Sequence, residues 1–225
     1  MNTDTEHLLN LTTDLAVSPR SGKSLEIPDW NTASRLIFPF LESVSAPADG
    51  SVSRSPLCAS GVSAERSFDP LSGMLTSCIK MSLALFYRGA VIPLSESLVR
   101  EWAVSMAAVR LAMDANIALV ARSSRFEQHR KGSLCYYSVH TDAAPFNSVL
   151  PFYLPFQTAA AALLGSPFYF ALPERRTVIL FGSDVLPRYG SELRDDILLT
   201  YETSTSYLSP ELIEVSDSGV LPVSR

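Results

Sequence analysis

The longest stretch without a charged side chain, residues 143–173, limits the folds open to this chain more than any other feature. Its 31 residues are long enough to hold the roughly 20 apolar residues of a membrane-spanning helix. Four prolines argue against a span, because polar groups freed in lipid would need partners; they are Pro145, Pro151, Pro155 and Pro167. We therefore predict a buried helix followed by a buried strand.

The aromatic side chains of this stretch leave two further hypotheses open. Clustered aromatic residues often mark recognition surfaces, so an apolar partner surface is the first alternative to a core; its residues would be Phe146, Phe152, Tyr153 and Phe156. Peripheral attachment to a membrane through the same residues is the second, and we do not expect it.

Elsewhere, short apolar runs and helical spacings alternate along the chain. The clearest pair of strands, 168–172 and 177–181, is joined by four residues, which is hairpin length. Further strands are predicted within 76–87, 134–140 and 212–215, and helices after Ser95, Ser105 and Asn147 and within 186–201. Because these elements do not follow a strict βαβ repeat, we predict an α+β fold: a mixed or mainly antiparallel sheet packed with helices in one main domain.

The amino-acid composition changes near residue 72, which we take as a boundary between two parts of the chain. Residues 1–72 are predicted to form an N-terminal helical segment, with a helix over 5–17, and a Ser/Pro-rich loop or linker over 43–72. Between these, Pro39 restricts the apolar patch 36–41 to an edge strand or a loop anchor. Residues 73–225 are predicted to form the α+β domain.

Charge and cysteine content bear on partners and compartment. A net charge of −5 argues against nucleic acid as a partner, because binding it needs a basic field. The three cysteines are too few and too far apart for a disulfide framework. The first residues carry acids where a secretory signal would carry Lys or Arg. We therefore expect a cytoplasmic protein.

Several short sequence features occur along the chain in the same order as in a known family. They are a strand ending in Phe86-Tyr87, the step Trp102-x-x-Ser105, the helix Ala112-x-x-x-Asn116 with Ile117 and Leu119, the sequence Asn147-Ser148-x-Leu150, and the hairpin Leu172-Pro173-x-Arg175. In these features, over about residues 76–223, the chain resembles the YtpQ-like bacterial proteins of unknown function. The resemblance implies a cytosolic bacterial protein with an α+β domain, and no established activity.

One departure from that family affects the hairpin turn. The family usually carries Asn after the proline and Asp after the arginine, whereas this chain has Glu174 and Arg176. The local charge is reversed, which weakens a ligand-binding role for the turn.

No catalytic or cofactor motif is present. The histidines, His7, His129 and His140, are isolated in sequence, and neither a dinucleotide nor a phosphate motif occurs. We therefore expect no metal site and no cofactor. The nearest nucleophile set is His140, Asp142 and Ser148, but Asn147 or Ser148 is better explained as a helix cap, and His140 as a surface residue beside Asp142.

The binding candidates are polar or aromatic residues in apolar surroundings, together with two arginines at a hairpin tip. Asn116 is expected to bond the backbone of an adjacent loop rather than a ligand. Arg175 is expected at an exposed tip, where it could receive an anion. The full set is Asn116, His140, Asn147, Ser148, Phe152, Phe156 and Arg175.

We therefore predict a non-enzymatic binding or accessory module, with a protein partner or a second copy of the chain as its partner. The alternative is a hydrolase-like enzyme with a non-sequential site near residues 137–148, which would require His140 and Ser148 to converge within about 3.2 Å.

Overall fold

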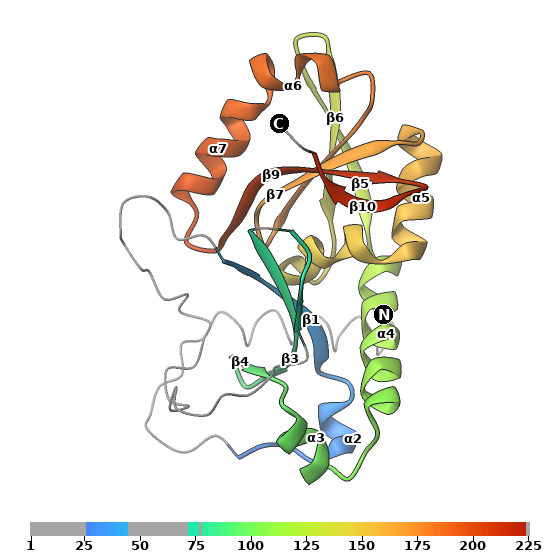
Figure 1. Cartoon of the computed structure of the whole chain (residues 1–225), viewed down its shortest axis with the longest axis vertical. Helices are drawn as coiled ribbons and strands as arrows, with labels where there is room; N and C mark the ends of the chain where they lie inside the picture. The colour runs from blue at the N-terminus through green and yellow to red at the C-terminus, as the bar shows by residue number, and fades with distance from the viewer. Residues whose placement is uncertain (1–25, 45–71, 77, 224–225) are drawn as a thin grey trace.

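The computed structural model describes residues 26–44, 72–76 and 78–223, and within them the chain folds into two antiparallel sheets and several helices (Figure 1). This is the predicted α+β fold in one domain. The predicted helix over 5–17 and most of the predicted loop over 43–72 lie outside the described residues.

The smaller sheet has four strands and lies in the lower half of Figure 1. Its central strand β3 pairs with all three others; the strands are β1 (Ile37–Ser43), β2 (Ser72–Met74), β3 (Ile79–Tyr87) and β4 (Ala90–Pro93). Pro39 lies in β1, an edge strand, as predicted. Strand β1 lies in residues 1–72, which were expected to form a separate N-terminal segment, but it pairs with β3 of residues 73–225.

Three helices accompany this sheet: α2 (Trp30–Ala33), α3 (Glu96–Glu101) and α4 (Met106–Arg122). The predicted caps are present. Leu98 N donates to Ser95 Oγ at 3.3 Å, and Ala108 N donates to Ser105 Oγ at 3.2 Å.

The larger sheet has six strands in the order β10-β9-β7-β8-β6-β5. These are β5 (Arg125–Lys131), β6 (Leu134–His140), β7 (Phe168–Glu174), β8 (Thr177–Gly182), β9 (Tyr207–Ser216) and β10 (Gly219–Pro222). The predicted hairpin is confirmed as β7 and β8, which pair antiparallel. The helices α6 (Leu186–Glu192) and α7 (Arg194–Thr203) occupy the segment in which a helix was expected.

Most of the uncharged stretch belongs to the core, as predicted, but its helix is not the buried helix that was expected, because it exposes Leu154 and Leu163. It forms a 3-10 helix η1 (Ala144–Phe152), the helix α5 (Leu154–Leu164) and then β7. Phe146 of η1 is buried and stacks on Phe38 of β1 with ring centroids 4.1 Å apart, so this stretch joins the two sheets. Among the described residues, no helix has the length and apolar character needed to cross a membrane.

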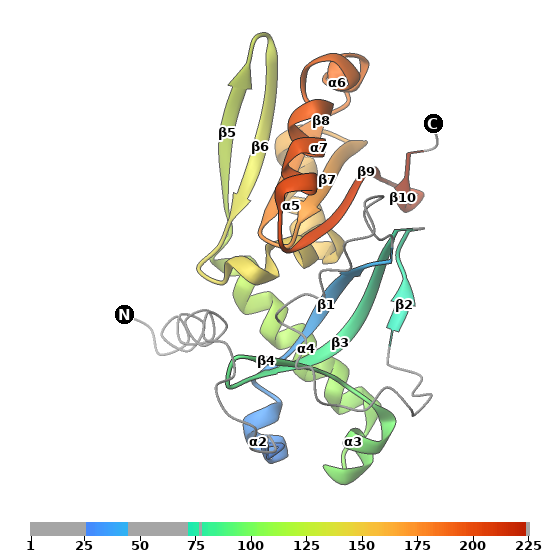
Figure 2. The same cartoon turned by 90° about the vertical axis from the view of Figure 1, so that its left-hand side faces the viewer.

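Strand β5 has no counterpart in the sequence analysis. With β6 it forms a long ribbon at one edge of the larger sheet (Figure 2). Five of its seven side chains are exposed, so the alternation of apolar and polar residues that marks a half-buried strand is missing. Gly132, with φ +59°, opens the two-residue turn that joins the strands, as a type II′ hairpin requires.

Candidate metal centre

Asn116 has the structural role that the sequence predicts. Its amide nitrogen, buried on α4, donates to the backbone oxygens of Ser34 at 2.9 Å and Ile37 at 2.8 Å. These bonds fasten α4 to the chain between α2 and β1. Both hydrogen-bond donors of the amide therefore serve the fold rather than a ligand.

Asn147 and Ser148 do not cap a helix, contrary to the prediction. Both lie inside η1, which begins three residues before Asn147, and both are buried. Asn147 Nδ2 donates to the backbone oxygens of Val139 at 3.0 Å and Arg176 at 2.9 Å, while its Oδ1 accepts from Thr141 Oγ1 at 2.6 Å. Asn147 therefore joins the end of β6 to the β7–β8 turn.

The aromatic candidates belong to the core. Phe156 is buried and lies 5.4 Å from Phe126 between ring centroids, and the half-buried Phe152 meets Phe170 edge-on at 5.5 Å. Of the two explanations left open for this stretch, core packing accounts for both side chains.

Arg175 is not at an exposed tip, because β1 covers its side of the β7–β8 turn. Its side chain is buried, its Nε donates to the backbone oxygen of Leu41 at 3.1 Å, and its guanidinium carbon lies 4.6 Å from the centroid of the Phe40 ring. Arg176 is the exposed member of the pair. Arg175 thus connects the two sheets.

His140 is a surface residue, as predicted, but its acidic neighbour is a different one. Its Nε2 lies 3.0 Å from Glu127 Oε2, on the adjacent strand, rather than beside the carboxylate of Asp142. The hydrogen bonds that the structure gives to its ring lead to residues of the hairpin, whereas Ser148 is only 1% exposed within η1. The pairing of His140 with Ser148 that the hydrolase alternative requires is therefore not formed.

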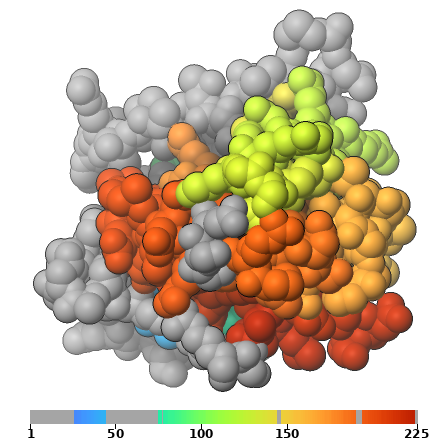
Figure 3. Space-filling view, turned by 90° about the horizontal axis from the view of Figure 1, so that it is seen from above, coloured from blue at the N-terminus to red at the C-terminus, as the bar shows by residue number. Residues whose placement is uncertain are grey.

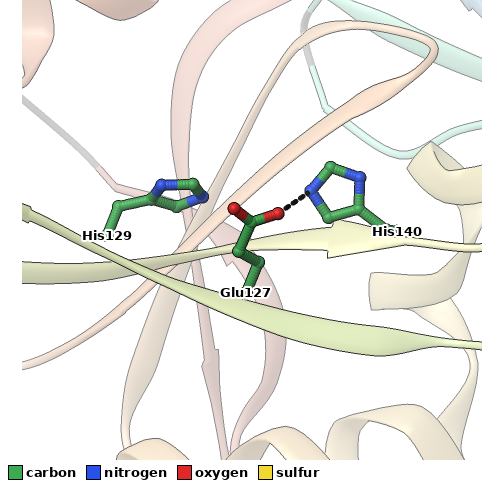
Figure 4. A group of neighbouring side chains, drawn as sticks. All are labelled: Glu127, His129 and His140. Carbon is green, nitrogen blue, oxygen red and sulfur yellow. Dashed lines mark ion pairs between the residues drawn. The ribbon is translucent and has the colours of Figure 1, made fainter.

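Instead, His140 belongs to a cluster on the hairpin with Glu127 and His129 (Figure 4). The antiparallel register explains why they meet: Glu127 pairs with Ser138, and His140 and His129 flank that pair on the same face of the ribbon. One ligand atom from each of the three residues lies within 4.8 Å of the other two. In Figure 4 the Glu127 carboxylate lies between the two imidazole rings.

Ser138 holds the two rings together. Its Oγ lies 2.7 Å from His129 Nε2 and 2.8 Å from His140 Nε2. A carboxylate only accepts hydrogen bonds, so a hydrogen on Nε2 of His140 would serve the contact with Glu127, and the Ser138 hydroxyl could then donate to His129. His129 also stacks on Tyr136, with ring centroids 5.2 Å apart. Both imidazoles are therefore oriented by neighbours.

This arrangement matches the donor set of a metal centre. Two imidazoles and one carboxylate are the protein ligands of many catalytic zinc sites and of some iron sites, which keep further positions for water or substrate. Tetrahedral zinc with bonds of about 2.0–2.1 Å places its ligand atoms roughly 3.3 Å apart. The ligand atoms of the three residues already lie within 4.8 Å of one another, and the side chains of Glu127 and His140 are about 60% exposed, so packing does not hold them at their present spacing.

The same residues do not form a nucleophile–base–acid triad. In a triad, the base uses one ring nitrogen for the nucleophile and the other for the carboxylate. Here Ser138 and Glu127 both approach Nε2 of His140. Glu127 therefore does not orient the ring for proton transfer from Ser138.

Two contacts connect the hairpin to the helices beside it. Lys131 Nζ donates to Asp196 Oδ2 of α7 at 2.6 Å, and this hydrogen bond raises the pKa of Lys131. Near the turn, Arg188 of α6 donates to the Ser133 hydroxyl. The view onto this end of the molecule in Figure 3 shows the yellow-green hairpin beside the orange of α6 and α7. The β5–β6 hairpin that carries the cluster is therefore attached to α6 and α7 near its turn.

Glu127 and His129 are not indicated as a site by the sequence patterns, because these patterns do not indicate β5. One signal was available: Gly132-Ser133 is a two-residue hairpin turn before the predicted strand 134–140. Pairing outward from that turn places His129 opposite Tyr136 and Glu127 opposite Ser138. His140 then falls on the same face by alternation.

No family model, no curated protein and no solved structure matches this chain. The resemblance to the YtpQ-like family and the predicted protein partner or second copy are untested by these comparisons and remain predictions.

Proposed function

We propose that this chain is a non-enzymatic binding module whose β5–β6 hairpin binds a divalent transition-metal ion. The observation that carries the proposal is the convergence of Glu127, His129 and His140 on one face of the ribbon. By contrast, the polar side chains of Asn116 and Asn147 already bond backbone groups.

Ligand chemistry favours an ion of the zinc class. Imidazole nitrogen suits Zn²⁺, Co²⁺, Ni²⁺ and Fe²⁺, whereas Ca²⁺ and Mg²⁺ prefer sites made of oxygen ligands alone. One carboxylate neutralises half of the charge of a divalent ion. The stacking of His129 on Tyr136 limits the ring motion that the ion would otherwise have to arrest.

Isothermal titration of the metal-free full chain with Zn²⁺ tests the proposal. We expect one ion per chain, and affinity at least about 100-fold weaker in His129→Ala and His140→Ala, because each substitution removes one of three ligands. The matched control is His7→Ala, which removes the remaining histidine of the chain and should leave the affinity unchanged. Absence of zinc binding by the parent chain, or binding unaffected by both ligand substitutions, contradicts the proposal.

Ser138 is not expected to hold the ligands once the ion is bound. Its hydroxyl contacts Nε2 of both rings, so an ion bound at these atoms would displace it, and Ser138→Ala should bind zinc at least as tightly as the parent chain. A Ser138→Ala variant that binds zinc about 10-fold more weakly would show that the ion is held by Nδ1 of the rings and that the hydroxyl positions them.

A further inference from the structure

The charge distribution beside the candidate metal centre has a second consequence, which rests on the proposed function. Arg125 pairs directly with His140 across the two strands, so both side chains project from the same face of the ribbon. Side chains that are directly opposite in an antiparallel pair have Cβ atoms about 4.5–5.5 Å apart. The guanidinium of Arg125 is therefore within reach of whatever binds next to the His140 ring.

Arg125 is also available for a ligand. Its side chain is exposed, and it has no ion-pair or hydrogen-bond partner within the parts of the chain that the structure describes. The other cation on this face of β5, Lys131, is paired with Asp196. Arg125 is thus an exposed cation beside the cluster, on the same face of β5, whose guanidinium can bind a ligand.

The loaded centre would carry net positive charge. A divalent ion with one carboxylate and two neutral imidazoles has a charge of +1, and Arg125 adds another. Three protein ligands leave at least one coordination position to a non-protein ligand, and the exposure of Glu127 and His140 directs that position toward solvent. An anion at this position meets both charges at once.

We propose that the metal-loaded hairpin binds a small oxyanion, with one oxygen on the metal ion and a second oxygen on the guanidinium of Arg125. A group with two or more acceptor oxygens is required, because a single oxygen cannot occupy the coordination position and also meet the planar fork of arginine. Carboxylate and phosphate groups both satisfy this requirement.

Titration of the Co²⁺-loaded full chain with acetate and, separately, with inorganic phosphate tests the inference, with the visible absorption of the bound ion as the readout. Saturable spectral change with either anion is the expected result, and the tighter of the two identifies the class of group that the site accepts. In Arg125→Gln the same anion should bind at least about 10-fold more weakly, since a charge-assisted bond is lost.

The control is Arg130→Gln, which removes an exposed arginine from the opposite face of the same strand and should leave anion affinity unchanged. Co²⁺ binding itself should be retained in both variants, which shows that they are folded. If the parent chain does not bind Co²⁺, the proposed function fails. If it binds Co²⁺ but shows no anion response, or if Arg125→Gln and Arg130→Gln respond alike, the oxyanion inference alone is overturned.

Discussion

Two groups of polar side chains in this molecule use their hydrogen bonds differently. Asn116, Asn147 and Arg175 are buried, and each bonds to at least one backbone oxygen of a segment distant in sequence. Glu127, His129 and His140 lie on the exposed hairpin and are linked to one another, directly or through Ser138. Removing a buried amide leaves a backbone oxygen without a hydrogen-bond donor and destabilises the fold. An exposed imidazole, by contrast, can exchange its bond to a hydroxyl for a bond to a metal ion.

The comparison separates residues that fasten the fold from residues available to a ligand. Of the seven candidates drawn from sequence, the two asparagines and Arg175 fall in the first group and His140 in the second. The difference predicts opposite outcomes for substitutions in the two regions.

The largest effect is expected at Asn147. Asn147→Leu removes the donors to the oxygens of Val139 and Arg176 and the acceptor for the Thr141 hydroxyl, so the free energy of unfolding should fall by about 3 kcal/mol. Urea denaturation followed by circular dichroism measures it. A loss below about 1 kcal/mol would remove Asn147 from the group that fastens the fold.

Saturation with zinc should raise the free energy of unfolding of the parent chain by almost as much as Asn147→Leu lowers it. At free Zn²⁺ about 100-fold above the dissociation constant, the gain in free energy of unfolding is about 2.7 kcal/mol if the unfolded chain does not bind the ion. The gain should disappear in acid, because protons compete for the imidazole nitrogens. A thermal melt with and without zinc tests this, and an equal gain in His140→Ala would place the ion elsewhere.

A somewhat smaller loss is expected at Asn116. Asn116→Leu leaves the backbone oxygens of Ser34 and Ile37 without their amide donor, at a cost of about 2 kcal/mol. Zinc affinity, measured on the same sample, should not change. A variant of unchanged stability would contradict the anchoring role.

The smallest effect is expected at His140 without metal. Since its side chain is more than half exposed, His140→Ala should change the free energy of unfolding by less than about 0.5 kcal/mol in the presence of a chelator. The same substitution should abolish the zinc-dependent gain. A large loss of stability in chelator would mean that the hairpin cluster also fastens the fold.

Sequence patterns predicted the longer elements that are rich in apolar residues and did not indicate β5, which is not. The β7–β8 hairpin consists of two continuous apolar runs, α4 carries apolar residues at helical spacing, and the structure has both. Strand β5 is mostly exposed, so its sequence has neither pattern and only the glycine of the following turn marks it. His129 and His140 meet through pairing across that turn, which no spacing along the chain expresses.

Burial also explains the corrected site residues. The local sequence predicts Asn147 as a helix cap and Arg175 as a residue of an exposed hairpin tip, but the backbone oxygens that hold their side chains, of Arg176 and Leu41, come from distant parts of the chain. Contacts of this kind depend on tertiary packing and carry no local signal.

Strand β5 is an edge strand whose polar side chains contribute little to the core. Substitutions at Arg125, Glu127 or His129 therefore affect what the hairpin can hold without changing how the rest of the chain folds. Descendants of such a sequence could exchange one ligand for another through a few changes on this strand, because the stability of the molecule is set elsewhere. Under the proposed function, the residues that determine what the hairpin binds can therefore change without loss of the fold.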